Sequence, residues 1–268
     1  MGFFQKRAPL EKEWEKLMNE ERKFLLSRAV KRESFLNQKL EQMIPDKLQD
    51  TLDTAFAKAF GLIFDKGTGV IEKTYNKDEL EKSFQINQFA SDVRKDGKSL
   101  KKISKRAKQS GSVNLLVSGT AGIGMGVLGV GIPDIPVFIG MVLKSVYEIA
   151  LNYGYRYDNP EEQYFILLLI ETAVSHGREL VERNQEIDEY IKHEKMPEPY
   201  NRDVQIKLTS AMLSKELLYM KFLQGVPVVG AVGGAYDVVY LKQITEYANL
   251  KYKRRFLMKK RLVQNQKT

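Results

Sequence analysis

Apolar residues recur at helical spacing along most of this chain. The earliest segment, 10–44, carries an apolar stripe at intervals of three, four and seven residues, with Glu and Lys between: Leu10, Trp14, Leu17 and Phe24. Such spacing places these residues on one face, which predicts an amphipathic helix packed against a neighbour. Pro45 ends this segment, a second amphipathic helix is predicted over 46–64, and the DKGTG sequence at 65–69 is expected to break the chain.

The segment 113–133 is uncharged and rich in glycine, and some of its glycines follow one helix face: Gly119, Gly122, Gly126 and Gly129. A face without side chains lets another backbone approach closely. We therefore expect a glycine-faced helix that packs against a neighbour or enters a membrane surface. Pro133 and Pro136 then predict a hairpin bend, and 137–153 is predicted to return as a helix.

A second glycine-rich stretch, 225–237, contains Gly230 and Gly233. A proline lies near its start, and a helical segment with a Leu-Lys pair follows it, as in the first stretch. The similarity suggests a twofold repeat of bend plus helix.

Further helices are predicted over 78–90, 160–194 and 202–223 and near the end of the chain. Asn159 as the capping residue and Pro160 in the first helical position mark the start of 160–194, whose apolar first half predicts a central core helix. No segment shows the two-residue alternation of strands. The sequence thus predicts an all-α protein, a multi-helix globular bundle with two glycine-rich helical hairpin or bend segments.

Composition agrees with a folded chain, since 43% of its 268 residues are hydrophobic. The expected divisions are an N-terminal helical region at 1–77, a helical domain at 78–258 and a basic flexible tail at 259–268. The chain has no cysteine, which excludes disulfides, zinc-thiolate sites and iron-sulfur clusters and agrees with a cytoplasmic location. The N-terminus becomes charged within a few residues and lacks the apolar core of a secretory signal.

A formal net charge of +9 indicates a partner that carries phosphate, either lipid or nucleic acid. Two segments hold much of the positive charge, 95–108 and 251–261. We expect them to contact lipid phosphate through Lys101, Lys105, Arg106, Lys253, Arg254 and Arg255. The alternative for 95–108 is a solvated helix face with no partner. Nucleic-acid binding is a further alternative because aromatic residues interleave with the cations in 251–256, but no helix-turn-helix, RNA-recognition or zinc-finger signature supports it.

Candidate chemistry is sparse. The glycines at 124–129 match the dinucleotide fingerprint by letter but lie between helical segments, so no cofactor is predicted. An alternative is a soluble hydrolase that uses Asp134, Glu171, His176 and Asp237 as acid and base, which requires these side chains to converge on one cleft. No zinc-binding HExxH motif and no nucleophile pattern accompany them. The sequence therefore favours a protein without catalytic, metal or cofactor residues.

Three blocks of sequence carry a resemblance to a known family: PDIPVFIGMVLKSVYEIALNYGY, YDNPEEQYFILLLI and KFLQGVPVVGAVGGAYDVVYLKQITEYANLKYKRRFL. Together they resemble the EcsC family of bacterial proteins over about 78–257, and the bend with its returning helix is also similar to glycine-rich hairpins of some bacterial GTPases. The resemblance implies no enzymatic activity and a role near an Ecs-type ABC transporter that influences protein secretion.

From both lines of reasoning we expect a non-catalytic accessory protein, cytoplasmic and peripheral at the inner face of the cell membrane. Its expected partners are anionic lipid and subunits of the ABC transporter. The close-packing or membrane-facing residues would be the glycines already named, Gly230 and Gly233 included, together with Pro133.

Overall fold

Helices account for nearly all of the regular structure in the computed structural model, which describes residues 8–29, 45–94, 97–117, 134–223 and 235–266. The elements are α1 (Pro9–Arg28), α3 (Asp46–Leu62), the π-helical turn η1 (Ile63–Gly67), α4 (Thr68–Glu72), α5 (Lys77–Arg94), α6 (Gly97–Val117), α7 (Asp134–Asn152), α8 (Pro160–Val174), α9 (Gly177–His193), α10 (Arg202–Leu223) and α11 (Ala235–Asn265). Within these ranges there is no strand, so the all-α prediction is confirmed.

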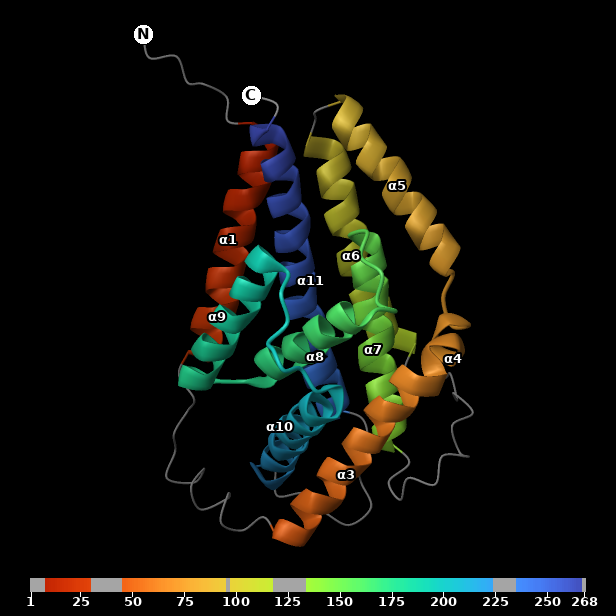
Figure 1. Ribbon diagram of the computed structural model, residues 1–268, viewed down its shortest axis with the longest axis vertical. Coiled ribbons are helices and arrows are strands. Elements are labelled where there is room, and N and C mark those ends of the chain that lie inside the picture. The colour runs from red at the N-terminus through yellow and green to blue at the C-terminus, as the bar shows by residue number, and fades with distance from the viewer. Residues whose placement is uncertain (1–7, 30–44, 95–96, 118–133, 224–234, 267–268) are drawn as a thin grey trace.

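The centre of the molecule is formed by α7, α8 and α11 (Figure 1). Helix α8 crosses α11 near the middle of the view, and its side chains are buried without interruption from Tyr164 to Val174. The predicted start of α8 is confirmed, since the Glu162 N–H donates to Asn159 Oδ1 at 2.7 Å and Pro160 occupies the first turn. This helix is the central core helix that its apolar sequence predicts.

Helix α7 is the one segment of the described chain that is long and apolar enough to cross a membrane. Within the fold, however, 83% of the segment Ile135–Asn152 is buried. The apolar side chains of α7 therefore pack in the protein core in this structure. Helix α7 begins at Asp134, so Pro136 lies in its first turn, where a missing N–H costs no hydrogen bond.

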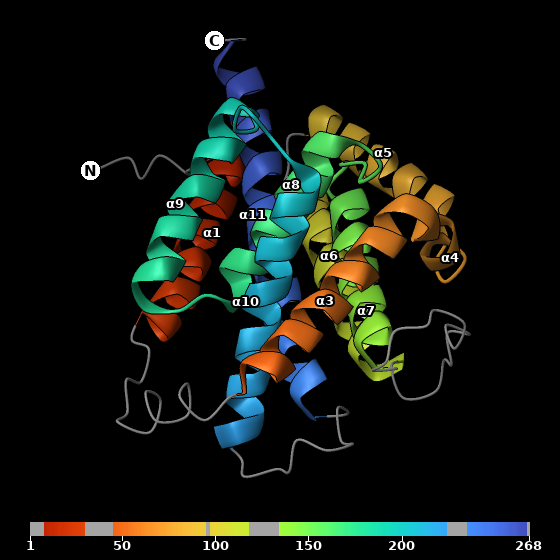
Figure 2. The same ribbon diagram turned by 60° about the horizontal axis from the view of Figure 1, so that its bottom comes forward.

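The N-terminal helices belong to the same core as the rest. Helix α1 packs on α11, α6 and α9, while α3 packs on α10 and α7 (Figure 2). Leu17 of α1 and Phe60 of α3 are both fully buried in this core. The boundary expected at residue 77 thus does not separate two hydrophobic cores.

Three predicted boundaries differ from the structure. The segment 160–194 is two helices, because Ser175 and His176 are extended and Gly177 has a φ of 58°, in the left-handed region that favours glycine. The break expected at 65–69 is helical, as η1 and α4. The tail expected at 259–268 is helical as far as Asn265, and ion pairs to other helices, Lys260 with Asp92 and Arg261 with Glu11, hold it in place.

Candidate functional site

The predicted glycine positions lie outside the residues that the structure describes. Gly119, Gly122, Gly126, Gly129 and Pro133 fall in 118–133, and Gly230 and Gly233 fall in 224–234. The structure does show that 118–133 joins two helices that pack on each other, α6 and α7. The glycine-faced hairpins remain predictions.

The three α11 cations expected to contact lipid lie in ion pairs inside the protein. Lys253 Nζ is 3.0 Å from Glu13 Oε2, and both side chains are at most 5% exposed. The other two pairs join Arg254 to Glu21 at 2.6 Å and Arg255 to Glu162 at 2.7 Å. The expectation that Lys253, Arg254 and Arg255 face lipid phosphate is wrong in this structure, because carboxylates of α1 and α8 already neutralise them.

Neighbouring residues extend these pairs into a network that we call the α11 clasp: Lys251, Tyr252, Lys253, Arg254 and Arg255 with Glu13, Glu21, Glu162 and Asp188. Lys251 is fully buried and lies 2.7 Å from Asp188 and 3.5 Å from Glu21. The Tyr252 hydroxyl donates to Glu162 Oε1 at 2.6 Å, and the Arg255 guanidinium lies over the rings of Tyr155 and Phe165. The clasp joins α11 to α1, α8 and α9.

A sequence signal for the clasp exists in α1. Glu13 and Glu21 occupy the same helical stripe as Leu10, Leu17 and Phe24, at spacings of three and four residues, and all five are buried. Carboxylates within an apolar stripe need a cationic partner, since an unpaired buried charge is very costly. The periodicity alone does not identify that partner.

The cations of α6 have the opposite environment, since Lys101, Lys105 and Arg106 are exposed, as is Lys102. Helix α6 carries no acidic residue. Over the described part of the chain, no ion pair joins these four cations to a carboxylate. They form a positively charged surface, which we call the α6 basic face.

Beside the α6 basic face, α5 carries an exposed apolar stripe that the sequence analysis missed. Ile86, Phe89 and Val93 are 68%, 71% and 63% exposed, at helical spacings of three and four residues. The polar residues Asn87 and Ser91 of the same helix are buried instead. Sequence periodicity detects this stripe but assigns it to the core, because an apolar helix face is usually the buried one.

Packing on the far side of α5 fixes this orientation. The Phe84 ring lies 6.0 Å from that of Phe256 on α11, in an edge-to-face arrangement. Phe84 also covers Gly154, whose φ of 82° and missing Cβ leave room for the ring. Because Phe84 faces inward, Ile86, Phe89 and Val93 are held on the outer side of α5.

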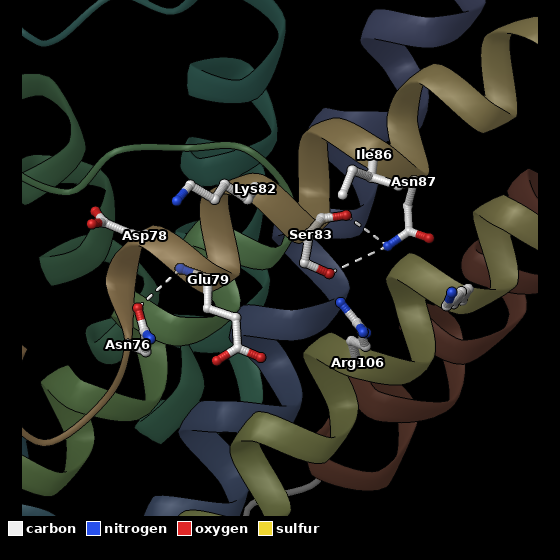
Figure 3. Close-up of a pocket in the computed structure, with 9 residues that line it drawn as sticks. Asn76, Asp78, Glu79, Lys82, Ser83, Ile86, Asn87 and Arg106 are labelled. Carbon is white, nitrogen blue, oxygen red and sulfur yellow. Dashed lines mark hydrogen bonds between the residues drawn. The ribbon is translucent and has the colours of Figure 1, made fainter.

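A groove of about 600 Å³ separates α5 from α6 (Figure 3). Its walls include an apolar residue, cations, carboxylates and amides: Asn76, Asp78, Glu79, Lys82, Ser83, Ile86, Asn87, Lys102 and Arg106. Ile86 belongs to the apolar stripe, and Lys102 and Arg106 belong to the α6 basic face. The groove therefore connects the two exposed surfaces.

The carboxylates and histidine of the hydrolase alternative are not brought together where they are described. Glu171 is fully buried and accepts hydrogen bonds from Gln205 at 2.6 Å and Thr209 at 2.5 Å, while Arg183 lies 3.0 Å from its other oxygen. Burial raises the pKa of Glu171 to about 7. Glu171, Arg183, Gln205 and Thr209 form a polar cluster that joins α8, α9 and α10.

His176 faces another part of α10, with its Nδ1 3.7 Å from Glu216. Thr209 and Glu216 are about 10 Å apart along that helix, at about 1.5 Å per residue, so Glu171 and His176 contact different turns of α10. The side chains of Asp134 and Asp237 lie outside the description. Among the described side chains, no group of three or more His, Cys, Asp or Glu could hold a metal ion.

Comparison with known proteins places the chain in a family. The family model of the EcsC protein family matches residues 10–257, which extends the resemblance from 78–257 to include α1 and α3. No curated protein and no solved structure matches the chain significantly. With a match over nearly its whole length, the chain belongs to the EcsC protein family.

Proposed function

We propose that this protein binds the surface of an anionic membrane through the apolar stripe of α5 and the α6 basic face. The observation that carries the proposal is the exposure of Ile86, Phe89 and Val93 on α5, where Ile86 lines the same groove as the exposed cations Lys102 and Arg106. Peripheral membrane proteins combine these two features, because apolar side chains enter the headgroup region while Lys and Arg attract anionic lipid.

Rough magnitudes support reversible attachment. Each Lys or Arg near an anionic surface contributes about 1 kcal/mol, and full burial of a large apolar side chain contributes about 1.5–3 kcal/mol. Partial insertion of the stripe together with a few cations therefore gives binding that salt can weaken. Nucleic acid would use the cations but would leave the apolar stripe exposed to water.

The proposal includes an accessory role beside an Ecs-type ABC transporter in protein secretion. Its support is the family membership together with a surface suited to the cytoplasmic face of a membrane. Attachment to the bilayer would confine the protein to the plane in which a transporter's membrane subunits lie, which raises the rate of their encounter.

The test is sedimentation of the purified protein with vesicles of phosphatidylcholine alone or mixed with phosphatidylglycerol, at low and high salt. The wild-type protein should bind only the anionic vesicles, and high salt should weaken this binding. The variant Lys101→Gln/Lys105→Gln/Arg106→Gln should bind about 100-fold less tightly, at about 1 kcal/mol for each cation.

A matched control removes the same charge elsewhere, at the exposed Lys58, Lys195 and Lys207. The control Lys58→Gln/Lys195→Gln/Lys207→Gln should lose much less affinity, because net charge is the only property that it shares with the first variant. Equal losses in the two triple variants would contradict a defined α6 surface. Binding that ignores both salt and lipid charge would contradict the proposal as a whole.

A further inference from the structure

The groove between α5 and α6 holds charges of both signs without pairing them. Glu79 of α5 and Arg106 of α6 extend into the space between the helices from opposite sides (Figure 3). No ion pair joins either of them to another described residue, although both line the same groove. Lys102 adds a second cation from α6. Asp78 and Lys82 of α5 also line the groove, with their charged ends directed away from Glu79 and Arg106 (Figure 3).

A ligand of one charge does not suit this arrangement. A simple anion that meets Arg106 and Lys102 also meets the carboxylate of Glu79, and like charges placed together cost binding energy. A ligand with a phosphate at one end and an ammonium group at the other pairs with both sets at once. The groove thus favours a zwitterion.

The residues around the groove narrow the range of possible ligands further. Ile86 lines the groove and begins the apolar stripe that continues to Phe89 and Val93, so a bound headgroup could keep its acyl chains along apolar side chains. No aromatic side chain is among the lining residues, whereas quaternary ammonium groups are typically held by aromatic cages. A primary ammonium has N–H groups that a carboxylate can accept.

We propose that the groove binds the phosphoethanolamine headgroup of a membrane lipid. Arg106 and Lys102 donate to the phosphate oxygens, and the Ser83 hydroxyl is placed to donate as well. The Glu79 carboxylate accepts hydrogen bonds from the ammonium group. Asn76 helps to hold Glu79, because Asn76 Oδ1 accepts the Glu79 backbone N–H at 3.0 Å. This inference rests on the proposed membrane function and adds a lipid preference to it.

The test compares vesicles with equal fractions of phosphatidylglycerol whose remaining lipid is either phosphatidylethanolamine or phosphatidylcholine. The wild-type protein should bind the ethanolamine vesicles about fivefold more tightly, as expected for roughly one additional exposed ion pair. Glu79→Gln should remove this preference, so that the variant binds the two vesicle types with equal affinity. Glu179→Gln is a matched control, because Glu179 is also an exposed acid in the first turn of a helix, and it should retain the preference.

The outcomes separate the two proposals. Equal binding to both vesicle types, with dependence on phosphatidylglycerol intact, would overturn the headgroup site and leave the membrane function standing. A preference that survives in Glu79→Gln would also overturn the site, because it would then arise from the packing of the lipids. If no vesicle binds, the membrane function fails. Titration with soluble phosphoethanolamine then tests ligand binding to the groove without a membrane. If the groove binds the headgroup, NMR shifts of α5 and α6 amides should occur in the wild type and be absent in Glu79→Gln.

Discussion

Two lysine- and arginine-rich stretches of this chain look alike in sequence and have opposite environments in the fold. In α11, the cations of 251–255 are buried or half-buried in ion pairs with acids of α1, α8 and α9. In α6, Lys101, Lys102, Lys105 and Arg106 are exposed to solvent. The difference comes from their neighbours, because α1 brings Glu13 and Glu21 to α11, whereas α6 has α5 beside its exposed side.

This comparison shows that a run of positive charge does not identify a phosphate-binding surface. The α11 clasp stabilises the docking of helices that are far apart in sequence. The cations of the α6 basic face, which no ion pair within the described part of the chain neutralises, remain available to a ligand. The exposed apolar stripe beside it then distinguishes a membrane from other polyanions.

The largest expected effect comes from breaking the clasp at Arg255. Arg255→Met leaves the buried Glu162 without its cation, and loss of one partner from a buried ion pair costs about 3–5 kcal/mol of the free energy of unfolding. Arg106→Gln, which removes an exposed arginine, should change that free energy by less than about 0.5 kcal/mol. Urea unfolding of both variants measures the difference. A similar small effect at both positions would show that the α11 cations are not held as the structure has them.

A smaller effect is expected at Glu171, a buried carboxylate outside the clasp. Its pKa is raised from 4.5 to about 7, so the folded state holds the proton more tightly than the unfolded state. The stabilisation is therefore complete below about pH 4.5 and is lost as the pH rises to about 7. Replacement by Gln should remove about 3–3.5 kcal/mol of pH dependence, at about 1.36 kcal/mol per pKa unit.

The measurement is the free energy of unfolding of the wild type and of Glu171→Gln across this pH window. Because the other titrating groups are common to both proteins, the difference between the curves isolates Glu171. Parallel curves would show that Gln205, Thr209 and Arg183 hold the pKa of this carboxylate near its ordinary value.

The smallest expected effect sharpens the role of the α5 stripe. Phe89→Ser should weaken binding to anionic vesicles about fivefold to tenfold, as partial burial of one aromatic side chain contributes about 1 kcal/mol or slightly more. Val204→Ser, at another exposed apolar position, should leave binding unchanged. Vesicle sedimentation measures both variants. An unchanged affinity of Phe89→Ser would mean that the α6 cations act without the stripe.

Local sequence signals predicted much of the fold. The cap at Asn159, the apolar run of α8 and the bounds of α10 follow from hydrogen bonding and periodicity within a few turns, and the structure agrees with them. The break between α8 and α9 was missed because helical periodicity continues across Gly177. The turn consists of the extended residues Ser175 and His176 and the positive φ of Gly177.

The candidate surface was predictable only in part. The exposure of Lys101, Lys105 and Arg106 agrees with the expectation from sequence. Lys253, Arg254 and Arg255 lie in an equally cation-rich segment, but they are paired with carboxylates inside the protein. The stripe of Ile86, Phe89 and Val93 was visible as a periodic pattern, but its direction depends on Phe84 packing against Gly154 and Phe256.

By itself the sequence determined that this chain is helical, where some of its helices begin and end, and that it carries excess positive charge. Those properties depend on residues a few positions apart, which sequence shows directly. The tertiary structure decided which charges are neutralised and which apolar face meets water, because both depend on contacts between helices that lie far apart along the chain. The burial of the α11 cations and the exposure of the α5 stripe are both consequences of that packing.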